Sequence, residues 1–581
     1  MKLALKKQFF QYFSILTIVA SIAAIVSLIL IYGFYLPDKW VIRLFILEEI
    51  IAVIFILNLV TGFLLNPDKG EFIKDNPFEL SLMLLTLLSL IITVITSADS
   101  PHHLLRGSTP GSIIIPYFII ILVYNSINAL ITLFKSRGKR HFLSMSPARI
   151  MLLSYTIVII VGGLLLKLPK ATYSSISWID CLFTSASAIS VTGLSTVNIS
   201  EVFTFEGQLF ILLLIQVGGL GIVTLTSFIA LFIYRGIRLH TQVMVKEIFD
   251  SENFSSLTSI IKAILLLTFI AELAGAIGLY FAWGNLGLSE SDRIFSAIFH
   301  SVSAYCNCGL SIFPQGLETT SYSFNAISLI IIMILIICGG LGFYTFSDIL
   351  GIGEIGLIEK NGLTQQSKII LISTLILIIS GAFLIWILQF GQWRNFPFGE
   401  QMLNAFFLSV VSRTAGFSVT YIGGIAIPAA MVVIMLMYIG GAPNSTAGGI
   451  KITTGVILIN SFRAFAKGKN RVEVGWNTIP MVIVRKAYII FIVSIILIFV
   501  ALFMLSLTES SSFFDNFFEI ISAFGTVGLS RGITPGLSVM GKIVIIIVML
   551  AGKIGLYTLA LAVSEESEGS SYHFPEVNLM I

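Results

Sequence analysis

The sequence predicts an all-α polytopic membrane protein in which one short segment is repeated four times. Its composition indicates the membrane, because 56% of the 581 residues are hydrophobic and only 11% are charged. Such a chain would be an insoluble globule in water, but its composition suits a protein dissolved in lipid. The repeat is a glycine-centred strip, GTVGLS at residues 525–530, which recurs in three related copies.

Long apolar runs predict the membrane crossings. A helix needs about 20 apolar residues to cross a hydrocarbon core of about 30 Å. About twelve runs approach or exceed this length, at residues 11–36, 42–65, 79–98, 112–134, 148–168, 207–233, 261–283, 325–350, 369–391, 426–460, 487–507 and 539–563. The first run is too long for a cleaved signal peptide and lacks a small-residue cleavage site, so we expect a mature helix.

Basic loops predict the orientation of the chain. Lysine and arginine collect on the cytoplasmic side of a membrane, and here they cluster at residues 2–7, 135–141, 234–240 and 462–471. We therefore expect a multi-pass protein of the cell (inner) membrane with both termini in the cytoplasm. Lys167 and Lys170 fall on the outer side and depart from the rule.

Several function classes find little support. The net charge of +4 comes without a basic, aromatic-interleaved stretch, so nucleic acid is not an expected partner, whereas membrane lipid is. The four cysteines, at positions 181, 306, 308 and 338, are too few for a disulfide framework and are not spaced as a metal clip. No His-rich metal set or facing Ser/His pair indicates an enzyme or an organic cofactor, and an intramembrane enzyme or receptor is a distant alternative.

The four strips share their surroundings as well as their glycine. They read SVTGLS (190–195), CNCGLS (306–311), RTAGFS (413–418) and GTVGLS (525–530). A phenylalanine stands ten residues before each glycine and a serine two residues after it. A serine also stands six residues before the glycine in three copies, whereas the third copy has Val410. The third repeat is therefore the most altered.

Each strip follows an apolar stretch of only about a dozen residues, which is too short to cross and must enter and turn back. Non-helical backbone is tolerated at membrane depth only where it is buried in protein or lines water. Glycine allows successive carbonyls to turn toward an axis, and rings of carbonyls replace the water shell of a bare cation. The strips are thus predicted to form a selectivity filter, with the preceding short helix directing its negative end toward the cation. A tight turn or a helix-packing surface is the alternative for any single copy.

The motifs SVTGLS, HSVSAYCNCGLS, SRTAGFS and SAFGTVGLS resemble the Trk/Ktr/HKT superfamily of potassium transporters over roughly residues 145–565. The resemblance implies four pseudo-repeats of helix, pore helix, filter and helix around one central pore. The expected domains are a four-helix transmembrane module added at the amino terminus (1–141), pore repeats at 142–240, 241–360, 361–471 and 472–565, and a cytoplasmic tail (566–581).

In that superfamily the filter glycines and the carbonyls beside them bind the transported ion, K⁺. A serine at the first filter glycine goes with sodium permeation in some relatives, so Gly193 favours potassium. The residues carried over are Val191, Thr192, Gly193, Asn307, Cys308, Gly309, Thr414, Ala415, Gly416, Thr526, Val527 and Gly528.

A second irregularity, GGAPNSTAGGIK (440–451), interrupts an apolar run in the third repeat. The flanking segments are too short to span alone, which places this piece inside the membrane. The resemblance implies an intramembrane gate loop, with Lys553 of the last apolar run restricting the pore; the gate residues are Gly440, Gly441, Asn444, Ser445, Thr446, Gly448, Gly449 and Lys553. The alternatives are a cytoplasmic connection between two short helices and a lysine that snorkels to the interface.

Other charged residues carry weaker signals. We hypothesise that Arg413 and Glu519 pair and brace the filter. Acidic residues in the apolar runs, Glu48, Glu49 and Glu272, could cap, pair or line a cavity, and His102, His103 and His300 are expected in polar regions rather than as ligands. GIGEIG (351–356) has the spelling of a dinucleotide loop but follows an apolar helix, which argues against that function.

The sequence favours potassium uptake through this pore, either channel-like or coupled to sodium or protons. The superfamily implies a homodimer and a separate cytoplasmic nucleotide-binding regulatory ring of the RCK type. The potassium-translocating subunit of a P-type pump is the alternative within transport. The amino-terminal module lacks an arginine ladder and could be a structural collar or a sensing module.

Overall fold

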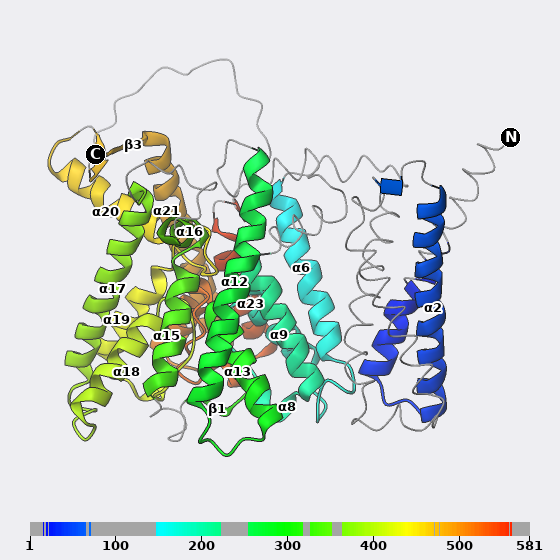
Figure 1. Ribbon diagram of the computed structural model, residues 1–581. Helices are drawn as coiled ribbons and strands as arrows, with labels where there is room; N and C mark the ends of the chain where they lie inside the picture. The colour runs from blue at the N-terminus through cyan, green and yellow to red at the C-terminus, as the bar shows by residue number, and fades with distance from the viewer. Residues whose placement is uncertain are drawn as a thin grey trace. The chain divides into compact units, whose positions relative to one another are not determined.

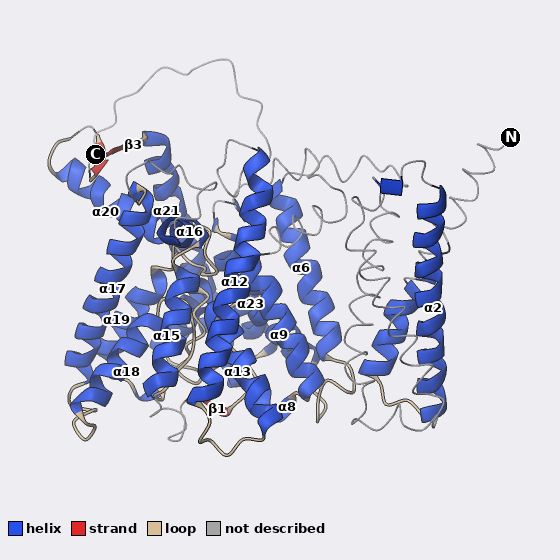
Figure 2. Ribbon diagram, viewed as in Figure 1, coloured by secondary structure: helices blue, strands red, loops and turns tan. Residues whose placement is uncertain are grey.

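The computed structural model describes residues 16, 19–20, 22–65, 69–70, 147–221, 254–317, 326–350, 363–469, 471–475, 477–556 and 558–559. The chain divides into two compact units, one of residues 1–144 with 168–170 and one of residues 145–167 with 171–581. Most described residues are helical (Figures 1 and 2).

The first unit contains two described apolar helices, Ile22–Gly33 and α2 (Asp38–Leu65). They pack through a small cluster that includes Ala24 and Ile51. Within it the Ser27 hydroxyl donates a hydrogen bond of 3.0 Å to the buried Glu48 carboxylate. The predicted runs at 79–98 and 112–134, and with them His102 and His103, lie outside the described residues.

The second unit repeats one order of elements: a long helix, a short helix, a glycine strip and a further helix. The helices of the four successive sets are α6 (Pro147–Leu166), α7 (Trp178–Ser190) and α9 (Phe205–Leu220); α12 (Phe254–Ala282), α13 (Glu290–Tyr305) and α15 (Ala326–Gly340); α17 (Gln365–Gln389), α18 (Phe398–Val411) and α19 (Ile427–Tyr438); and α21 (Met481–Thr508), α22 (Phe513–Gly525) and α23 (Val539–Ile554).

Short elements connect these helices. Residues that follow the strips form α8 (Ile199–Val202), β1 (Pro314–Leu317) and the 3₁₀ turns η3 (Ile422–Gly424) and η4 (Thr534–Gly536). Helix α16 (Phe343–Leu350) follows α15, and α20 (Ile452–Ala466) leads to an antiparallel hairpin of β2 (Val472–Val474) and β3 (Asn477–Ile479), in which Val472 faces Ile479.

Three of the four short helices begin with the same capping signal. The hydroxyls of Ser177, Ser289 and Ser512 accept the backbone N–H of an aspartate three residues later. This bond satisfies a free N–H at the start of a helix, and the aspartate places negative charge at the positive end of the helix dipole. Helix α18 instead follows Pro397 and has no side-chain cap. The caps fix where each short helix starts and therefore where its strip lies.

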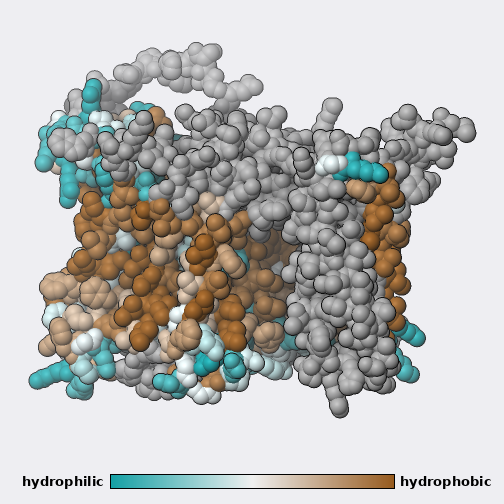
Figure 3. All heavy atoms as spheres, viewed as in Figure 1, coloured by the Kyte–Doolittle hydropathy of each residue, from teal (hydrophilic) through white to brown (hydrophobic). Residues whose placement is uncertain are grey.

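The long helices have the length and exposure expected in lipid. Among the described residues, four helices are long and apolar enough to cross a membrane: Ala148–Leu166, Ala263–Ala282, Gln365–Gln389 and Met481–Thr508. Their outer faces are apolar. On α17, for example, the side chains of Leu375, Ile379 and Phe383 are each more than half exposed. Figure 3 shows hydrophobic surface over α12, α15 and α17, with hydrophilic residues toward the helix ends.

The predicted span at 325–350 is not one straight helix, which corrects the sequence prediction. Helices α15 and α16 meet at an angle of 104°. Gly342 lies at the bend with φ of +78°, a conformation that side chains other than glycine rarely adopt. Within the described ranges, a fifth candidate span is obtained if this bent pair is counted as one. The break faces the site described next.

Candidate functional site: a ring of four glycine strips

Three short helices end in one local structure that turns the chain into its strip. The residue two before the strip glycine is left-handed in each case, Val191 (φ 57°), Asn307 (φ 60°) and Thr526 (φ 49°). The next backbone N–H bonds back to the serine carbonyl of the short helix: Thr192 to Ser187 at 2.8 Å, Cys308 to Ser303 at 2.7 Å and Val527 to Ser522 at 2.8 Å. The shared sequence pattern thus produces a shared backbone turn.

The serine hydroxyl of each turn also holds the strip. Ser187 accepts the N–H of Gly193 at 3.0 Å, and Ser522 accepts the N–H of Gly528 at 3.1 Å. In the second copy the Ser303 hydroxyl instead donates to the Leu310 carbonyl at 2.8 Å. These serines are fully buried, so their hydrogen bonds form without competition from water.

The third strip is built differently, as the substitution of the serine by Val410 leads one to expect. The valine side chain cannot accept a hydrogen bond from the strip. The backbone turn differs as well, because the N–H of Ala415 bonds to the carbonyl of Val411, at 2.9 Å, and not to that of Val410. Thr414 has φ of 155° rather than a left-handed value near 55°. The Asn307 side-chain amide and the Thr414 hydroxyl share a hydrogen bond of 3.1 Å, which joins the second and third strips.

The four strip glycines lie against one another in a closed cycle. A Cβ atom added to Gly193 would overlap the carbonyl oxygen of Cys308, and one added to Gly309 would overlap that of Ala415. In the same way Gly416 lies against the carbonyl of Val527, and Gly528 against that of Thr192, which closes the cycle. Each glycine thus contacts the carbonyl that precedes the glycine of the next strip.

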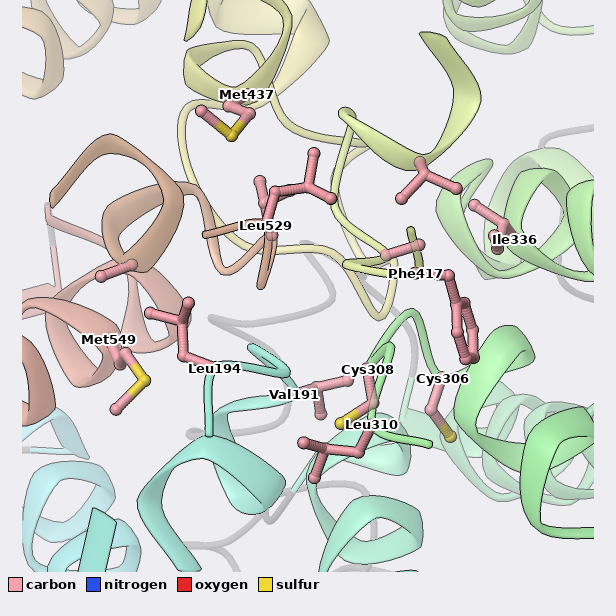
Figure 4. Close-up of a cluster of buried hydrophobic side chains, with 14 of the residues drawn as sticks. Val191, Leu194, Cys306, Cys308, Leu310, Ile336, Phe417, Met437, Leu529 and Met549 are labelled. Atoms are coloured by element: carbon pink, nitrogen blue, oxygen red, sulfur yellow. The ribbon is translucent and has the colours of Figure 1, made fainter. Parts of the chain in front are cut away.

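Backbone conformation adds to this steric requirement, because all four glycines have positive φ, between 67° and 93°. Figure 4 shows the surroundings of the cycle, with Val191, Cys308, Phe417 and Leu529 coming from four different segments of the chain. The side chains that follow the glycines are buried in the common core: Leu194, Leu310, Phe417 and Leu529. At the four glycines the strips therefore contact one another through backbone rather than through side chains.

The predicted gate loop, residues 440–451, is non-helical between α19 and α20. Its backbone is bonded to three neighbours. Ala442 donates to the Gly340 carbonyl at the α15 end at 2.9 Å, and Gly449 donates to the Gly552 carbonyl of α23 at 3.2 Å. Gly448 donates to the Thr526 hydroxyl of the fourth strip at 3.0 Å. The loop thus lies directly against the glycine strips.

The polar residues of the loop shape its own turn and its contact with the broken helix. Asn444 is left-handed (φ 56°), and its carbonyl accepts the N–H of Phe343 at 3.2 Å. The Ser445 hydroxyl donates to the Ala442 carbonyl at 2.6 Å. Gly440 donates to the Ile450 carbonyl at 2.8 Å, which closes the base of the loop. Gly441 has no room for a Cβ, which would lie 2.8 Å from the Gly340 carbonyl.

A cavity of about 230 Å³ lies beside the loop. It is lined by the ends of α9 and α15, the start of α16, residues 444–447 and two lysines, Lys451 and Lys553. The Lys553 ammonium donates to the Thr446 carbonyl at 2.6 Å, and the Lys451 ammonium donates to the Ala447 carbonyl. Lys553 therefore points toward the loop and contacts it through Thr446.

The predicted pairing of Arg413 with Glu519 is not formed. Within the part of the chain that the structure describes, no ion pair joins these two residues. Glu519 is fully buried, and its two carboxylate oxygens accept from the hydroxyls of Ser530, at 2.8 Å, and Thr534. Because neighbours in its own repeat satisfy this carboxylate, it has no need of the arginine. The Arg413 Nε atom is buried without a hydrogen-bond partner.

The structure shows the surroundings of two further residues that the sequence analysis left open or placed elsewhere, Glu272 and His300. Glu272 is buried where α9, α12 and α13 meet, accepting from the Gln216 amide at 3.2 Å and from the Cys306 thiol at 3.7 Å. His300, expected in a polar region, is instead fully buried behind the second strip. GIGEIG (351–356) lies outside the described residues, and so does the side chain of Glu49.

Sequence reasoning missed two ion pairs that join parts of the ring. Lys542 of α23 pairs with Asp180 of α7 at 2.7 Å, linking the last repeat to the first. Arg531, directly after the fourth strip, pairs with Asp515 at 2.6 Å and donates to the Gly423 carbonyl of the third repeat at 3.1 Å. The capping aspartates were visible in the sequence, but their basic partners lie too far along the chain for spacing to reveal.

Comparison with known proteins finds a matching family model and several relatives of this sequence. Residues 114–573 match the family model described as TrkH: Cation transport protein. The chain is 35% identical to Ktr system potassium uptake protein B of Vibrio alginolyticus over 76% of its own length and 96% of the relative's. It is 32% identical to the protein of the same name in Bacillus subtilis, over 74% of its own length and 96% of the relative's. The chain is also 34% identical to the potassium/sodium uptake protein NtpJ of Enterococcus hirae, over 78% of its own length and 100% of the relative's.

The fold itself has a solved counterpart. The crystal structure of the potassium transporter TrkH from Vibrio parahaemolyticus superimposes with a TM-score of 0.61, covering 89% of this chain and 98% of that one. Sequence identity between the two is 17%. The shared arrangement of helices therefore persists although most side chains differ.

Proposed function

The chain belongs to the TrkH family of cation transport proteins, and we propose that it takes up potassium ions across a membrane through the ring of four glycine strips. Relatives that the chain covers over 96% or more of their own length are named as potassium or potassium/sodium uptake proteins. The proposal assigns the filter to the backbone carbonyls of residues 191–193, 307–309, 414–416 and 526–528.

The closed cycle of glycines carries this proposal. Four strips that meet backbone to backbone, each with a glycine against the carbonyl of the next, bring oxygen atoms from four segments to one place. Carbonyl rings of this kind replace the hydration shell of an alkali ion. Four short helices that end at the strips add the negative ends of their dipoles. A packing surface would need none of the four left-handed glycines.

We assign the gate to residues 440–451. The hydrogen bonds to the broken helix, to α23 and to Thr526 hold the loop against the strips, so an ion leaving the filter on that side meets it. Lys553 adds a positive charge at the cavity, where it repels a cation and ties down the loop through Thr446. Passage of potassium then requires that the loop move aside.

The remaining parts of the proposal concern the whole assembly. The chain is a multi-pass membrane protein. We place it in the cell (inner) membrane with both termini in the cytoplasm, because loops rich in lysine and arginine favour the cytoplasmic side. Two chains associate, and a cytoplasmic nucleotide-binding ring acts on the gate. We further propose that the amino-terminal module of residues 1–141 adds transmembrane helices to the chain.

The experiment uses the purified full chain in proteoliposomes loaded with potassium, and it measures uptake of radioactive rubidium. External potassium should compete with rubidium, and sodium should compete poorly. Gly193→Ser should weaken this discrimination, because its side chain would overlap the Cys308 carbonyl. Gly455→Ser is the matched control, since open space surrounds Gly455 in α20. Absence of rubidium uptake by the unaltered chain, or unchanged discrimination in Gly193→Ser, would overturn the proposal.

A further inference from the structure

One position behind the strips differs between alternate repeats. Nine residues before the strip glycine, the short helices carry Thr184, His300, Phe407 and Glu519 in chain order. All four side chains are buried, with exposures of 1% or less. The second and fourth repeats, opposite in the cycle, therefore bury a hydrogen-bonding and titratable group where the first has a threonine and the third a phenylalanine. Buried groups of this kind require partners.

His300 and Glu519 have the same partner, the serine two residues after the strip glycine. The His300 Nε2 atom lies 2.8 Å from the Ser311 hydroxyl, and a Glu519 oxygen accepts from the Ser530 hydroxyl at 2.8 Å. The His300 Nδ1 atom faces the Ser296 carbonyl at 2.8 Å. Because that carbonyl can only accept, Nδ1 carries the proton, and Nε2 of the neutral ring accepts from serine.

The two serines then hold the chain beyond the strip in the same way. Ser311 accepts the backbone N–H of Phe313 at 3.1 Å, and Ser530 accepts that of Gly532 at 3.0 Å. An acceptor on the short helix, a serine hydroxyl and a backbone N–H thus form one relay in both repeats. The relay spans the glycine from behind and fixes the outer half of the strip to the helix that precedes it.

The first and third repeats lack this relay. In the first, the Ser195 hydroxyl donates to the Val197 carbonyl at 2.6 Å instead of to the short helix. The Thr184 hydroxyl, at the matching position, is buried without a hydrogen-bond partner. Phe407 of the third repeat offers no acceptor. The geometry therefore separates two anchored strips from two that are held by other contacts.

His300 also connects neighbouring strips through its ring. It stacks on Phe313, with ring centroids 4.4 Å apart, and lies 6.2 Å from the ring of Phe417, which directly follows the third strip glycine. Trp283 packs edge-on against it at 5.2 Å. The anchored second strip thereby supports the third, which has Val410 in place of the turn serine and Phe407 in place of the acceptor.

We propose that His300 and Glu519 are positioning residues that set potassium over sodium selection, by anchoring the outer halves of the second and fourth strips through Ser311 and Ser530. The inference rests on the proposed function, in which these strips coordinate the ion. Sodium is smaller than potassium, so carbonyls must move inward to coordinate it. Selection by a carbonyl ring depends on how far its oxygens can move and at what cost. Two anchored strips facing each other resist that inward movement.

The test measures rubidium uptake into proteoliposomes by the full chain, as the apparent KM, the maximal rate and the concentration of sodium that halves uptake. Glu519→Ala removes the acceptor of both the Ser530 and the Thr534 hydroxyl, and it should lower potassium over sodium selection by on the order of tenfold or more. Glu519→Gln, which keeps an acceptor oxygen, should recover most of it. His300→Phe keeps the ring stacking but removes the acceptor, and it should also lower selection. Thr184→Val, at the unanchored position, should leave selection unchanged.

Ser530→Ala removes the same hydrogen bond with a smaller change in packing, and it carries the test if Glu519→Ala does not fold. The double variant should show no further loss of selection than Glu519→Ala alone, because the bond that Ser530→Ala removes is already absent without the Glu519 carboxylate. A role in folding alone would lower the maximal rate and leave the sodium competition as it is. Unchanged selection in both Ser530→Ala and His300→Phe overturns the inference while the proposed function stands. No uptake by the unaltered chain overturns both.

Discussion

Replacing Lys553 by methionine should raise the rate of potassium flux. The Lys553 ammonium donates to the Thr446 carbonyl at 2.6 Å, so it stabilises the loop in its observed position, which the proposed function takes as the one that blocks the pore. Methionine has a similar length and an apolar body but neither charge nor donor. The loop then loses one contact that exists only in its blocking position, and the cavity loses a charge that repels cations.

The size of the effect follows from the hydrogen bond. A hydrogen bond to a charged group contributes about 1.5–3 kcal/mol, and about 1.4 kcal/mol corresponds to a tenfold change in an equilibrium. Loss of the bond should therefore shift the loop toward its displaced position by roughly 10- to 150-fold. Removal of the charge acts in the same direction, because a buried cation repels an approaching potassium ion.

The assay is the initial rate of rubidium uptake into proteoliposomes. Lys553→Arg keeps the charge and donors and should stay near the unaltered rate, whereas Lys553→Gln keeps a donor without the charge and should fall between. Arg463→Met removes a cation from the exposed end of α20 and serves as the control. A flux in Lys553→Met at or below that of the unaltered chain, with normal elution and thermal unfolding, would refute the assigned role of this lysine.

Three further outcomes follow from the contacts around the ring. Arg531→Met should lower the thermal unfolding temperature in detergent, because it removes an ion pair and bonds to carbonyls of the third repeat, together about 2 kcal/mol; Arg394→Met, at an exposed site, is the control. Gly552→Ala should destabilise the fold by about 1–3 kcal/mol, measured by the same unfolding, since its Cβ would overlap the Phe524 carbonyl; an unchanged transition would contradict that packing. Gly342→Ala should raise rubidium flux by weakening the contact between the helix bend and the loop. Alanine is strained at a φ of +78° by about 1–2 kcal/mol, and its Cβ would lie 2.5 Å from the Pro443 carbonyl of the loop. Flux no higher than in the unaltered chain would argue against this.

The strips could be located from the sequence because their requirement is local. A left-handed backbone needs glycine, and a short helix that must turn back leaves an apolar stretch that is too short to cross. Four copies made the pattern specific. In the structure the four glycines lie together, since backbone contact tolerates no side chain and the sequence shows which positions have none.

The partners of the buried polar side chains could not be predicted in this way. Glu519 lies at the depth of Arg413 in the sequence pattern, which suggested an ion pair, but Thr534 and Ser530 satisfy it from the turn beyond the strip. The bend at Gly342 was missed for a related reason. Residues 325–350 read as one apolar run, and glycines are common in membrane helices; what distinguishes the bend is the loop of another repeat, which supplies partners for the freed backbone groups.

The proposed gate and the proposed filter are joined through the fourth repeat. Gly448 of the loop donates to the Thr526 hydroxyl, and Thr526 is the left-handed residue that starts the fourth strip. Gly449, one residue on, donates to the Gly552 carbonyl of α23, the helix that also carries Lys553. A loop that moves aside must break these bonds, and the groups it leaves are part of the strip itself or of the helix beside it. Opening the gate therefore removes a support from the fourth strip, so a device that anchors this strip independently, as the Glu519 relay does, lets the loop move while the carbonyl positions are kept.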